Sequence, residues 1–137
     1  MSYTFIALLG FAFWTLALLF LIINLRAIAV LFQGKAINGF SPDGSGESAF
    51  SQRLCRAHAN CYESLGIAVA VLLTAIVTEQ TVITEPLALA YLAARIAQST
   101  VHLFSIAPWA VWLRVSFQLM QIVILAYWII QLALMLF

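Results

Sequence analysis

No charged residue occurs from Met1 to Leu25, and this apolar run is long enough to cross a lipid bilayer. A membrane-spanning helix needs about 20 mostly apolar residues. The chain has 137 residues, of which 65% are hydrophobic and only 8% are charged, whereas soluble domains are about 25% charged. A fold this small cannot hide so much apolar surface from water. The composition therefore excludes a soluble monomer and indicates a polytopic membrane protein.

Polar segments divide the sequence into four apolar stretches, each long enough to span a bilayer. The predicted helices lie within a single domain over residues 1–137 and cover about 3–32, 48–77, 86–105 and 108–137, with a polar loop at 33–47. Ser48 or Ser51 is expected to cap the second helix, because a serine side chain accepts hydrogen bonds from unpaired backbone amides. Thr84 and Pro86 predict the start of the third helix, and Pro108 predicts the start of the fourth. The expected fold is an all-α membrane protein, a bundle of four transmembrane helices.

Basic residues are distributed unequally among the loops, and this sets the expected orientation. Four of them flank the first loop: Arg26, Lys35, Arg53 and Arg56. Arg114 lies near the third loop, whereas the second loop carries only Glu79 and Glu85. Because basic residues favour the cytoplasmic side, we expect the first and third loops in the cytoplasm and both termini outside. The chain is short and has no obvious retention or sorting signal, so we expect a bacterial inner membrane, or the endoplasmic reticulum in a eukaryote.

The sequence gives no support to several other classes of site. The formal net charge of +1 provides no electrostatic footprint for a nucleic acid. Cys55 and Cys61 lie six residues apart at the cytoplasmic end of one helix, so no disulfide is expected between them. His58 and His102 do not share metal-ligand spacing with either cysteine, so no metal site is predicted.

Polar and charged residues interrupt three of the predicted spans at helical spacing. The stripes are Arg53, Arg56, Asn60 and Glu63; Arg95, Gln98, Ser99 and His102; and Arg114, Gln118 and Gln121. Steps of three and four place each stripe on one helix face. At a rise of about 1.5 Å per residue, Glu63 and Arg95 lie near the middle of the bilayer and could meet as a buried ion pair. A charge at that depth is costly unless it is paired or hydrated.

The remaining polar groups would line a wedge between the helices that opens to the cytoplasm. Guanidinium groups bind carboxylates bidentately, so a wedge with several arginines, with the amides of Asn60 and Gln98, suits an anionic, peptide-like ligand. The alternative interpretation is structural. Polar contacts commonly hold membrane helices together, Arg114 could extend to the interface, and Arg53 and Lys35 could serve only as topology-setting flanks.

Three parts of the sequence resemble one family, the membrane-associated proteins in eicosanoid and glutathione metabolism (MAPEG). The segment Arg53-Leu54-Cys55-Arg56-Ala57-His58-Ala59-Asn60-Cys61-Tyr62-Glu63 resembles the family signature of Arg-Ala followed by an asparagine and a glutamate within a span. The segment from Ala94 to His102 is similar to the third helix of the family. Arg114 resembles an arginine at the start of the family's fourth helix.

The resemblance implies a homotrimer that binds glutathione between subunits, in sites open to the cytoplasm. Six residues would bind glutathione: Arg56, Asn60, Glu63, Arg95, Gln98 and Arg26. Arg95 and Gln98 would do so from the neighbouring subunit. Arg114 would stabilise the thiolate, and His102 occupies a position where many members have a tyrosine, so these two are the expected catalytic residues.

Three functions follow as hypotheses. The favoured one is a glutathione-dependent membrane transferase that acts on hydrophobic electrophiles or lipids, because a guanidinium beside the thiol favours the nucleophilic thiolate. Peroxidase or isomerase activity would be variants of it. The alternative is a non-enzymatic membrane protein of the same fold that presents lipids or substrates. A small transporter or channel is the third, and the mixed, asymmetric charges of the stripes disfavour it.

Overall fold

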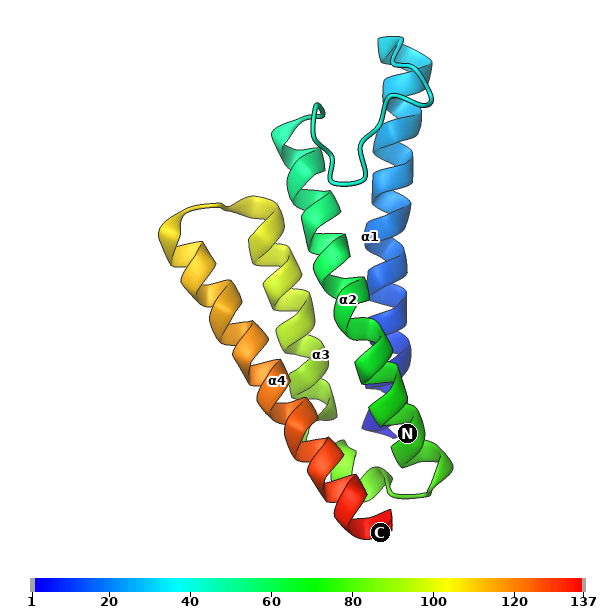
Figure 1. Ribbon diagram of the computed structural model, residues 1–137, viewed down its shortest axis with the longest axis vertical. Helices are drawn as coiled ribbons and strands as arrows, with labels where there is room; N and C mark the ends of the chain where they lie inside the picture. The colour runs from blue at the N-terminus through cyan, green and yellow to red at the C-terminus, as the bar shows by residue number, and fades with distance from the viewer. Residues whose placement is uncertain (1, 137) are drawn as a thin grey trace.

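The computed structural model describes residues 2–136 and folds them into an up-and-down bundle of four helices (Figure 1). The helices are α1 (Tyr3–Gln33), α2 (Ala49–Val77), α3 (Thr81–Phe104) and α4 (Pro108–Leu136). Each helix is long and apolar enough to cross a membrane. Both ends of the chain lie at one end of the bundle, together with the α2–α3 turn, and the other two connections lie at the opposite end. The all-α, four-span prediction is confirmed.

The helices are not packed symmetrically around one axis. Helix α1 packs against α2 and α3, and α4 packs mainly against α3, while α1 and α4 make no contact with each other over the described residues. A row of three aromatic rings runs through the interior of the bundle. The ring centroids of Phe11 and Tyr91 lie 6.0 Å apart, and those of Tyr91 and Trp128 lie 5.4 Å apart. These three rings tie α1, α3 and α4 together through the interior.

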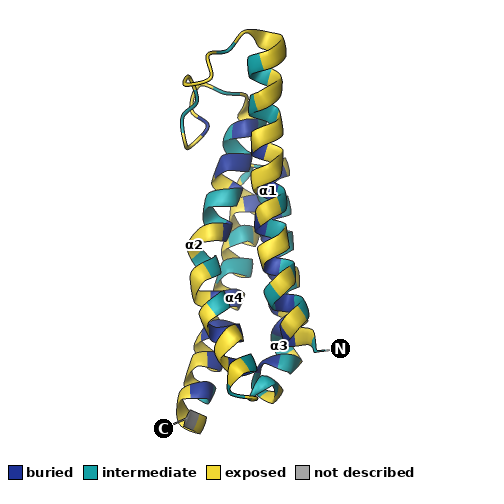
Figure 2. Ribbon diagram, turned by 90° about the vertical axis from the view of Figure 1, so that its right-hand side faces the viewer, coloured by how far each residue is buried: buried dark blue, intermediate teal, exposed yellow. Residues whose placement is uncertain are grey.

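The outer faces of the helices are exposed (Figure 2), and many of their exposed side chains are large and apolar. On α1, for example, Leu9, Phe13 and Phe20 are each about two-thirds exposed. A water-soluble protein does not leave continuous apolar faces of this kind uncovered. Lipid chains satisfy them, because a bilayer core is itself hydrocarbon. The chain is an integral, multi-pass membrane protein.

The N-terminal turn of α1 is capped by a carboxylate from α3. Glu85 accepts hydrogen bonds from the backbone N–H of Tyr3 at 2.8 Å and of Thr4 at 3.2 Å, and from the Ser2 hydroxyl. The hydroxyls of Thr4 and Thr84 lie 2.7 Å apart, and both are buried. A carboxylate at a helix N-terminus satisfies unpaired amides and complements the helix dipole. These contacts fix α1 and α3 at one end of the bundle.

The long connection between α1 and α2 has left-handed backbone at three glycines, Gly34, Gly44 and Gly46. Gly34 ends α1 with φ at +65°, and its N–H donates to the carbonyl of Ala29. Gly44, at φ +75°, passes so close to α2 that an added Cβ would lie 2.9 Å from Cα of Gln52. Of the two serines considered for the α2 cap, Ser48 takes this place and accepts from the N–H of Ser51 at 3.1 Å.

The prediction that Pro86 opens the third helix was wrong, because α3 begins at Thr81 and contains Pro86. The turn before it is short, since Glu79 adopts a left-handed φ of +59° and Gln80 donates to the carbonyl of Ala75 at 2.8 Å. A proline early in a helix removes one backbone hydrogen bond. The earlier start brings Thr84 and Glu85 against the N-terminus of α1, and those contacts offset the missing bond.

Candidate functional site

A polar groove of about 570 Å³ lies between α2 and α4, with α3 contributing two of its lining side chains. Its polar lining is Arg56, Asn60 and Glu63 from α2, Gln98 and His102 from α3, and Arg114 and Gln118 from α4. Six of the eight predicted site residues therefore lie together in one chain: Arg56, Asn60, Glu63, Gln98, His102 and Arg114. The volume falls within the roughly 300–1,000 Å³ of small-ligand sites.

The groove owes its chemistry to one face of α2. Arg56, Asn60 and Glu63 are separated by four and three residues, so their side chains point the same way from the helix. Arg56 and Glu63 are exposed and Asn60 is half-buried. Arg114 faces them from α4. It lies six residues after Pro108, the first residue of the helix, whereas the resemblance implies an arginine at the helix start. The groove thus holds two guanidinium groups and one carboxylate.

Arg95 does not line the groove but binds a residue that does, Asn60, from the interior of the bundle. Its side chain is 1% exposed, and its Nη1 donates to Oδ1 of Asn60 at 3.1 Å and to the Asn60 carbonyl at 3.3 Å. The guanidinium also lies over the ring of Phe11, 5.2 Å from its centroid. Arg95 therefore orients the Asn60 amide from the interior of the bundle.

The expected ion pair between Glu63 and Arg95 is not formed. In the part of the chain that the structure describes, the ion pair present is Arg26 with Glu47. Glu63 is exposed on the groove face of α2, whereas Arg95 points into the space between α1, α2 and α3. The two residues were placed at similar depth, but depth along a helix does not fix the direction in which a side chain points.

Three glutamine side chains join α3 and α4 beneath the groove. Gln121 donates through Nε2 to Oε1 of Gln98 at 2.8 Å, and Gln98 donates through Nε2 to Oε1 of Gln118 at 2.9 Å. Gln98 and Gln121 are buried, and Gln118 is half-buried at the groove wall. Gln118 was placed on a stripe by its spacing of four from Arg114, yet it was not predicted as a site residue.

Arg53 has a structural partner that the sequence did not reveal. Its Nε donates to the carbonyl of Leu103 at 2.8 Å, near the C-terminal end of α3. A cation is favourable there, because helix C-termini carry unpaired carbonyls and partial negative charge. Arg53 thus holds α2 to α3 beside the groove.

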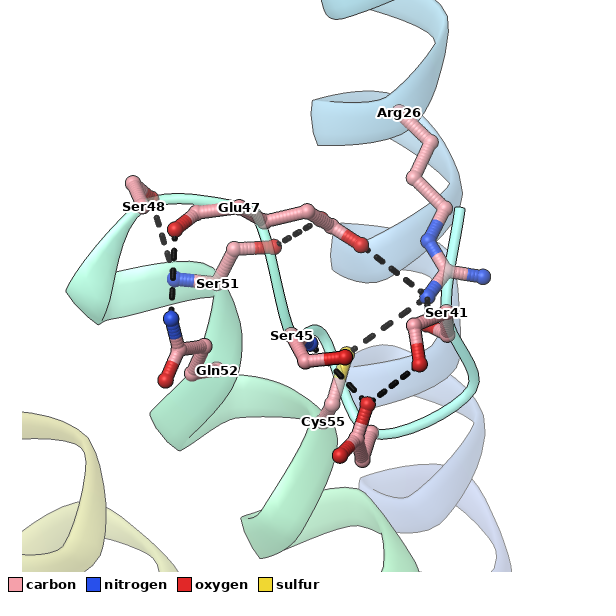
Figure 3. Close-up of polar contacts among 9 residues, drawn as sticks. Arg26, Ser41, Ser45, Glu47, Ser48, Ser51, Gln52 and Cys55 are labelled. Carbon is pink, nitrogen blue, oxygen red and sulfur yellow. Dashed lines mark hydrogen bonds and ion pairs between the residues drawn. The ribbon is translucent and has the colours of Figure 1, made fainter. Parts of the chain in front are cut away.

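Arg26 lies outside the groove, in a polar cluster that connects α1 to the first loop (Figure 3). Its Nη2 donates to the carbonyl of Ser41 at 2.6 Å and lies 3.3 Å from Oε1 of Glu47, with Sγ of Cys55 at 3.8 Å. Glu47 in turn accepts a hydrogen bond from the hydroxyl of Ser51. Within one chain, these contacts fasten the loop and keep Arg26 apart from Arg56.

The loop cluster includes a second, exposed carboxylate. Asp43 accepts hydrogen bonds from the Ser41 hydroxyl and from the backbone N–H of Ser45, at 3.0 Å from the latter. These bonds favour the charged form and lower the pKa of Asp43 to about 2. The loop turn therefore keeps its charged acceptor throughout the physiological pH range.

Gln98 and Arg95 both lie against the α2 stripe of their own chain. Gln98 and Arg95 were expected to reach the ligand from a neighbouring subunit. In the structure, Gln98 lines the same groove as Arg56, and Arg95 holds Asn60 of its own chain. Helix α3 lies directly against α2 within one chain, so the two residues reach the α2 stripe without a second copy.

Fold and groove together define a class: a polytopic helical membrane protein with a charged, ligand-sized groove between two spans. A model of the MAPEG family matches residues 4–134, which is nearly the whole chain, and the chain belongs to this family. No curated protein and no solved structure matches the chain in the same comparisons. The resemblance carried by the α2 and α3 segments is therefore confirmed at the level of the family.

Proposed function

We propose that the protein is a glutathione-dependent membrane transferase that acts on hydrophobic electrophiles or lipids. The observation that carries the proposal is the charge pattern of the groove. Glutathione has two carboxylates and one ammonium group, and the groove offers two guanidiniums, Arg56 and Arg114, and one carboxylate, Glu63. Arg56 and Glu63 pair with a carboxylate and with the ammonium group of the peptide, and Arg114 is left for the sulfur. Guanidinium–carboxylate pairs combine charge with a matched, two-pronged geometry.

The amides of the groove add specificity for a peptide. Asn60 is held by Arg95 and lines the groove beside Glu63, so its amide is oriented before a ligand arrives. A preorganised site avoids part of the ordering cost of binding. We assign the peptide-binding role to Arg56, Asn60 and Glu63, with Gln98 at the floor and Arg95 behind Asn60. Arg26 joins this set only if a second copy of the chain brings it to the groove.

Arg114 is the proposed catalytic residue. A free thiol has a pKa near 8.5 and is mostly protonated at neutral pH, while the thiolate is the reactive nucleophile. A guanidinium beside the sulfur stabilises the thiolate, and the groove holds the peptide in place for attack. His102 lines the same groove at the end of α3 and is proposed to contact the reacting part of the ligand.

The assembly and orientation follow from the same proposal. The lateral apolar faces of the helices would allow a hydrophobic substrate to reach the groove from the bilayer, and a homotrimer would place such a groove beside a neighbouring subunit. The basic residues around the first and third loops favour the cytoplasmic side for that end of the bundle, where glutathione is abundant in a cell. We propose a bacterial inner membrane as the location.

Binding is tested by titrating the purified protein with glutathione and with an analogue that lacks the α-amino group. We expect the parent protein to bind glutathione about tenfold more tightly than this analogue, since only glutathione has an ammonium group for Glu63. In Glu63→Gln, the two affinities should become similar. If millimolar glutathione neither binds nor raises the melting temperature, the transferase proposal is wrong and a protein that presents lipids is favoured.

Catalysis is tested separately with Arg114→Ala. We expect glutathione binding to weaken only modestly, while the thiolate absorbance of the bound peptide disappears and turnover of a general electrophile falls about 100-fold or more, as for loss of one preorganised charge-stabilising group. Arg114→Lys, which keeps the charge, should retain part of the signal. Equal thiolate absorbance in Arg114→Ala and the parent would remove Arg114 from this role.

A further inference from the structure

The three linked glutamines beneath the groove have a fixed direction, and a backbone carbonyl determines it. Nε2 of Gln121 lies 2.9 Å from the carbonyl of Phe117 and 2.8 Å from Oε1 of Gln98. A backbone carbonyl can only accept a hydrogen bond. The Gln121 side-chain atom that faces Phe117 must therefore be the amide nitrogen, and its second hydrogen goes to Gln98.

The alternative orientation of Gln121 is excluded by the same contacts. A flipped amide would place its oxygen against the carbonyl of Phe117 and against Oε1 of Gln98, two acceptors at once. Gln121 is completely buried, and its Oε1 has no hydrogen-bond partner within residues 2–136. Leaving this oxygen unpaired costs free energy, but the flipped amide would cost more, because its oxygen would face other acceptors.

The orientation of the Gln121 amide determines which atoms of Gln98 and Gln118 donate and which accept. Because Oε1 of Gln98 accepts from Gln121, its Nε2 is the group that donates to Oε1 of Gln118, at 2.9 Å. The oxygen of Gln118 is then occupied. Its Nε2 has no acceptor among the described residues, and Gln118 lines the groove one helical turn from Arg114.

We infer that Gln118 Nε2 is a ligand-binding donor, held toward an acceptor oxygen of the bound peptide by the buried amide of Gln121. The inference rests on the proposed function and adds two residues to its site. Gln118 contacts the ligand, and Gln121 is a positioning residue that acts through Gln98. The acceptor is a carboxylate or amide carbonyl oxygen of the peptide, since these are the acceptor oxygens that a peptide carries.

The primary test is the affinity of glutathione for Gln118→Met in the purified, detergent-solubilised protein, measured by calorimetry. Methionine keeps the volume and removes the donor, so we expect the Kd to rise about tenfold or more if the acceptor is a carboxylate. Gln131→Met is the matched control, because Gln131 is an amide on the same helix outside the groove. S-methylglutathione should show the same loss, since its oxygens are unchanged.

A double-mutant cycle tests the role of Gln121. Gln121→Met frees the Gln98 amide to turn, so that Gln118 presents its oxygen to the groove in place of its N–H. We expect Gln121→Met to weaken glutathione binding in the parent protein and to have no further effect in the Gln118→Met background. A purely structural role for Gln121 would weaken binding equally in both backgrounds, and that result would overturn the positioning role.

The outcomes separate this inference from the proposed function. If the parent protein does not bind glutathione, the proposed function fails and the inference fails with it. If the parent binds and Gln118→Met binds equally well, the inference alone is overturned. A loss confined to the free thiol, absent with S-methylglutathione, would place sulfur rather than oxygen at Gln118 and would also overturn it.

Discussion

Two arginine-containing clusters lie near the same end of the bundle, and their arginines differ in whether the chain supplies partners. Arg26 reaches a backbone carbonyl and the carboxylate of Glu47, whose side chain is only 7% exposed. Arg56 and Arg114 line the groove, and over residues 2–136 neither has a hydrogen-bond acceptor or an ion-pair partner. An arginine that is paired within the chain, such as Arg26, stabilises the fold. Charges that the chain leaves unsatisfied in a groove are available to a ligand.

The comparison separates two kinds of mutational effect. Removing a charge from the loop cluster should lower stability, because a nearly buried carboxylate loses its partner. Removing a charge from the groove should leave stability nearly unchanged, since no internal contact is lost. Ligand affinity should fall when a groove charge is removed and should change little when a charge of the loop cluster is removed.

Arg56→Ala is expected to give the largest effect on the groove. The Kd for glutathione should rise by about 10- to 100-fold, because hydrogen bonds to charged groups contribute about 1.5–3 kcal/mol, and the melting temperature should stay close to that of the parent. Arg53→Ala is the matched control on the same helix, since Arg53 bonds to the Leu103 carbonyl and does not line the groove. If Arg53→Ala weakened binding as much as Arg56→Ala, the distinction between partnered and free arginines would fail.

Arg26→Ala should affect stability instead. We expect the free energy of unfolding to fall by about 1–3 kcal/mol, because Glu47 and the Ser41 carbonyl lose their donor. Lys35→Ala provides the control: Lys35 and Arg26 both lie over the ring of Phe40, but only Arg26 also pairs with Glu47. Equal melting temperatures for the two variants in detergent would show that the Glu47 pair does not hold the loop.

The difference between Gly44→Ala and Gly46→Ala should be the smallest of the three effects, and it tests the backbone on which the loop cluster depends. Gly44 and Gly46 both have positive φ, but only at Gly44 would an added Cβ meet the backbone of Gln52. Left-handed backbone costs a residue with a Cβ roughly 1–2 kcal/mol, so both variants should be less stable. We expect Gly44→Ala to exceed Gly46→Ala by about 1 kcal/mol in thermal unfolding. Equal losses would mean that the loop shifts freely away from α2.

Much of the fold could be predicted because lipid imposes simple rules on a chain. Four long, mostly apolar stretches leave few alternatives to four spans, and Ser48 lies where a cap is needed. The start of α3 could not be predicted in this way. Pro86 is a typical helix-opening residue, and the reason that the helix begins five residues earlier lies in contacts made with the distant N-terminus of α1.

The site was predictable to the extent that it depends on spacing within one helix. Arg56, Asn60 and Glu63 share a face whatever surrounds them, and the structure brings them together with His102 and Arg114. The partner of Arg95 depends on how α2 and α3 are rotated about their own axes, which residue spacing does not fix. Gln118 was missed as a site residue for a related reason, because its importance depends on the direction of hydrogen bonds between two helices.

The carboxylate that caps α1 has a consequence for how the chain assembles during synthesis. Glu85 follows the amides that it caps by 81 and 82 residues, so the ribosome makes α1 and α2 before the cap exists. The end of α1 that Glu85 caps therefore keeps unpaired amides until α3 has been translated and inserted. Completion of the first helix is coupled to arrival of the third, and a nascent chain stopped after α2 would hold α1 with a loosened end.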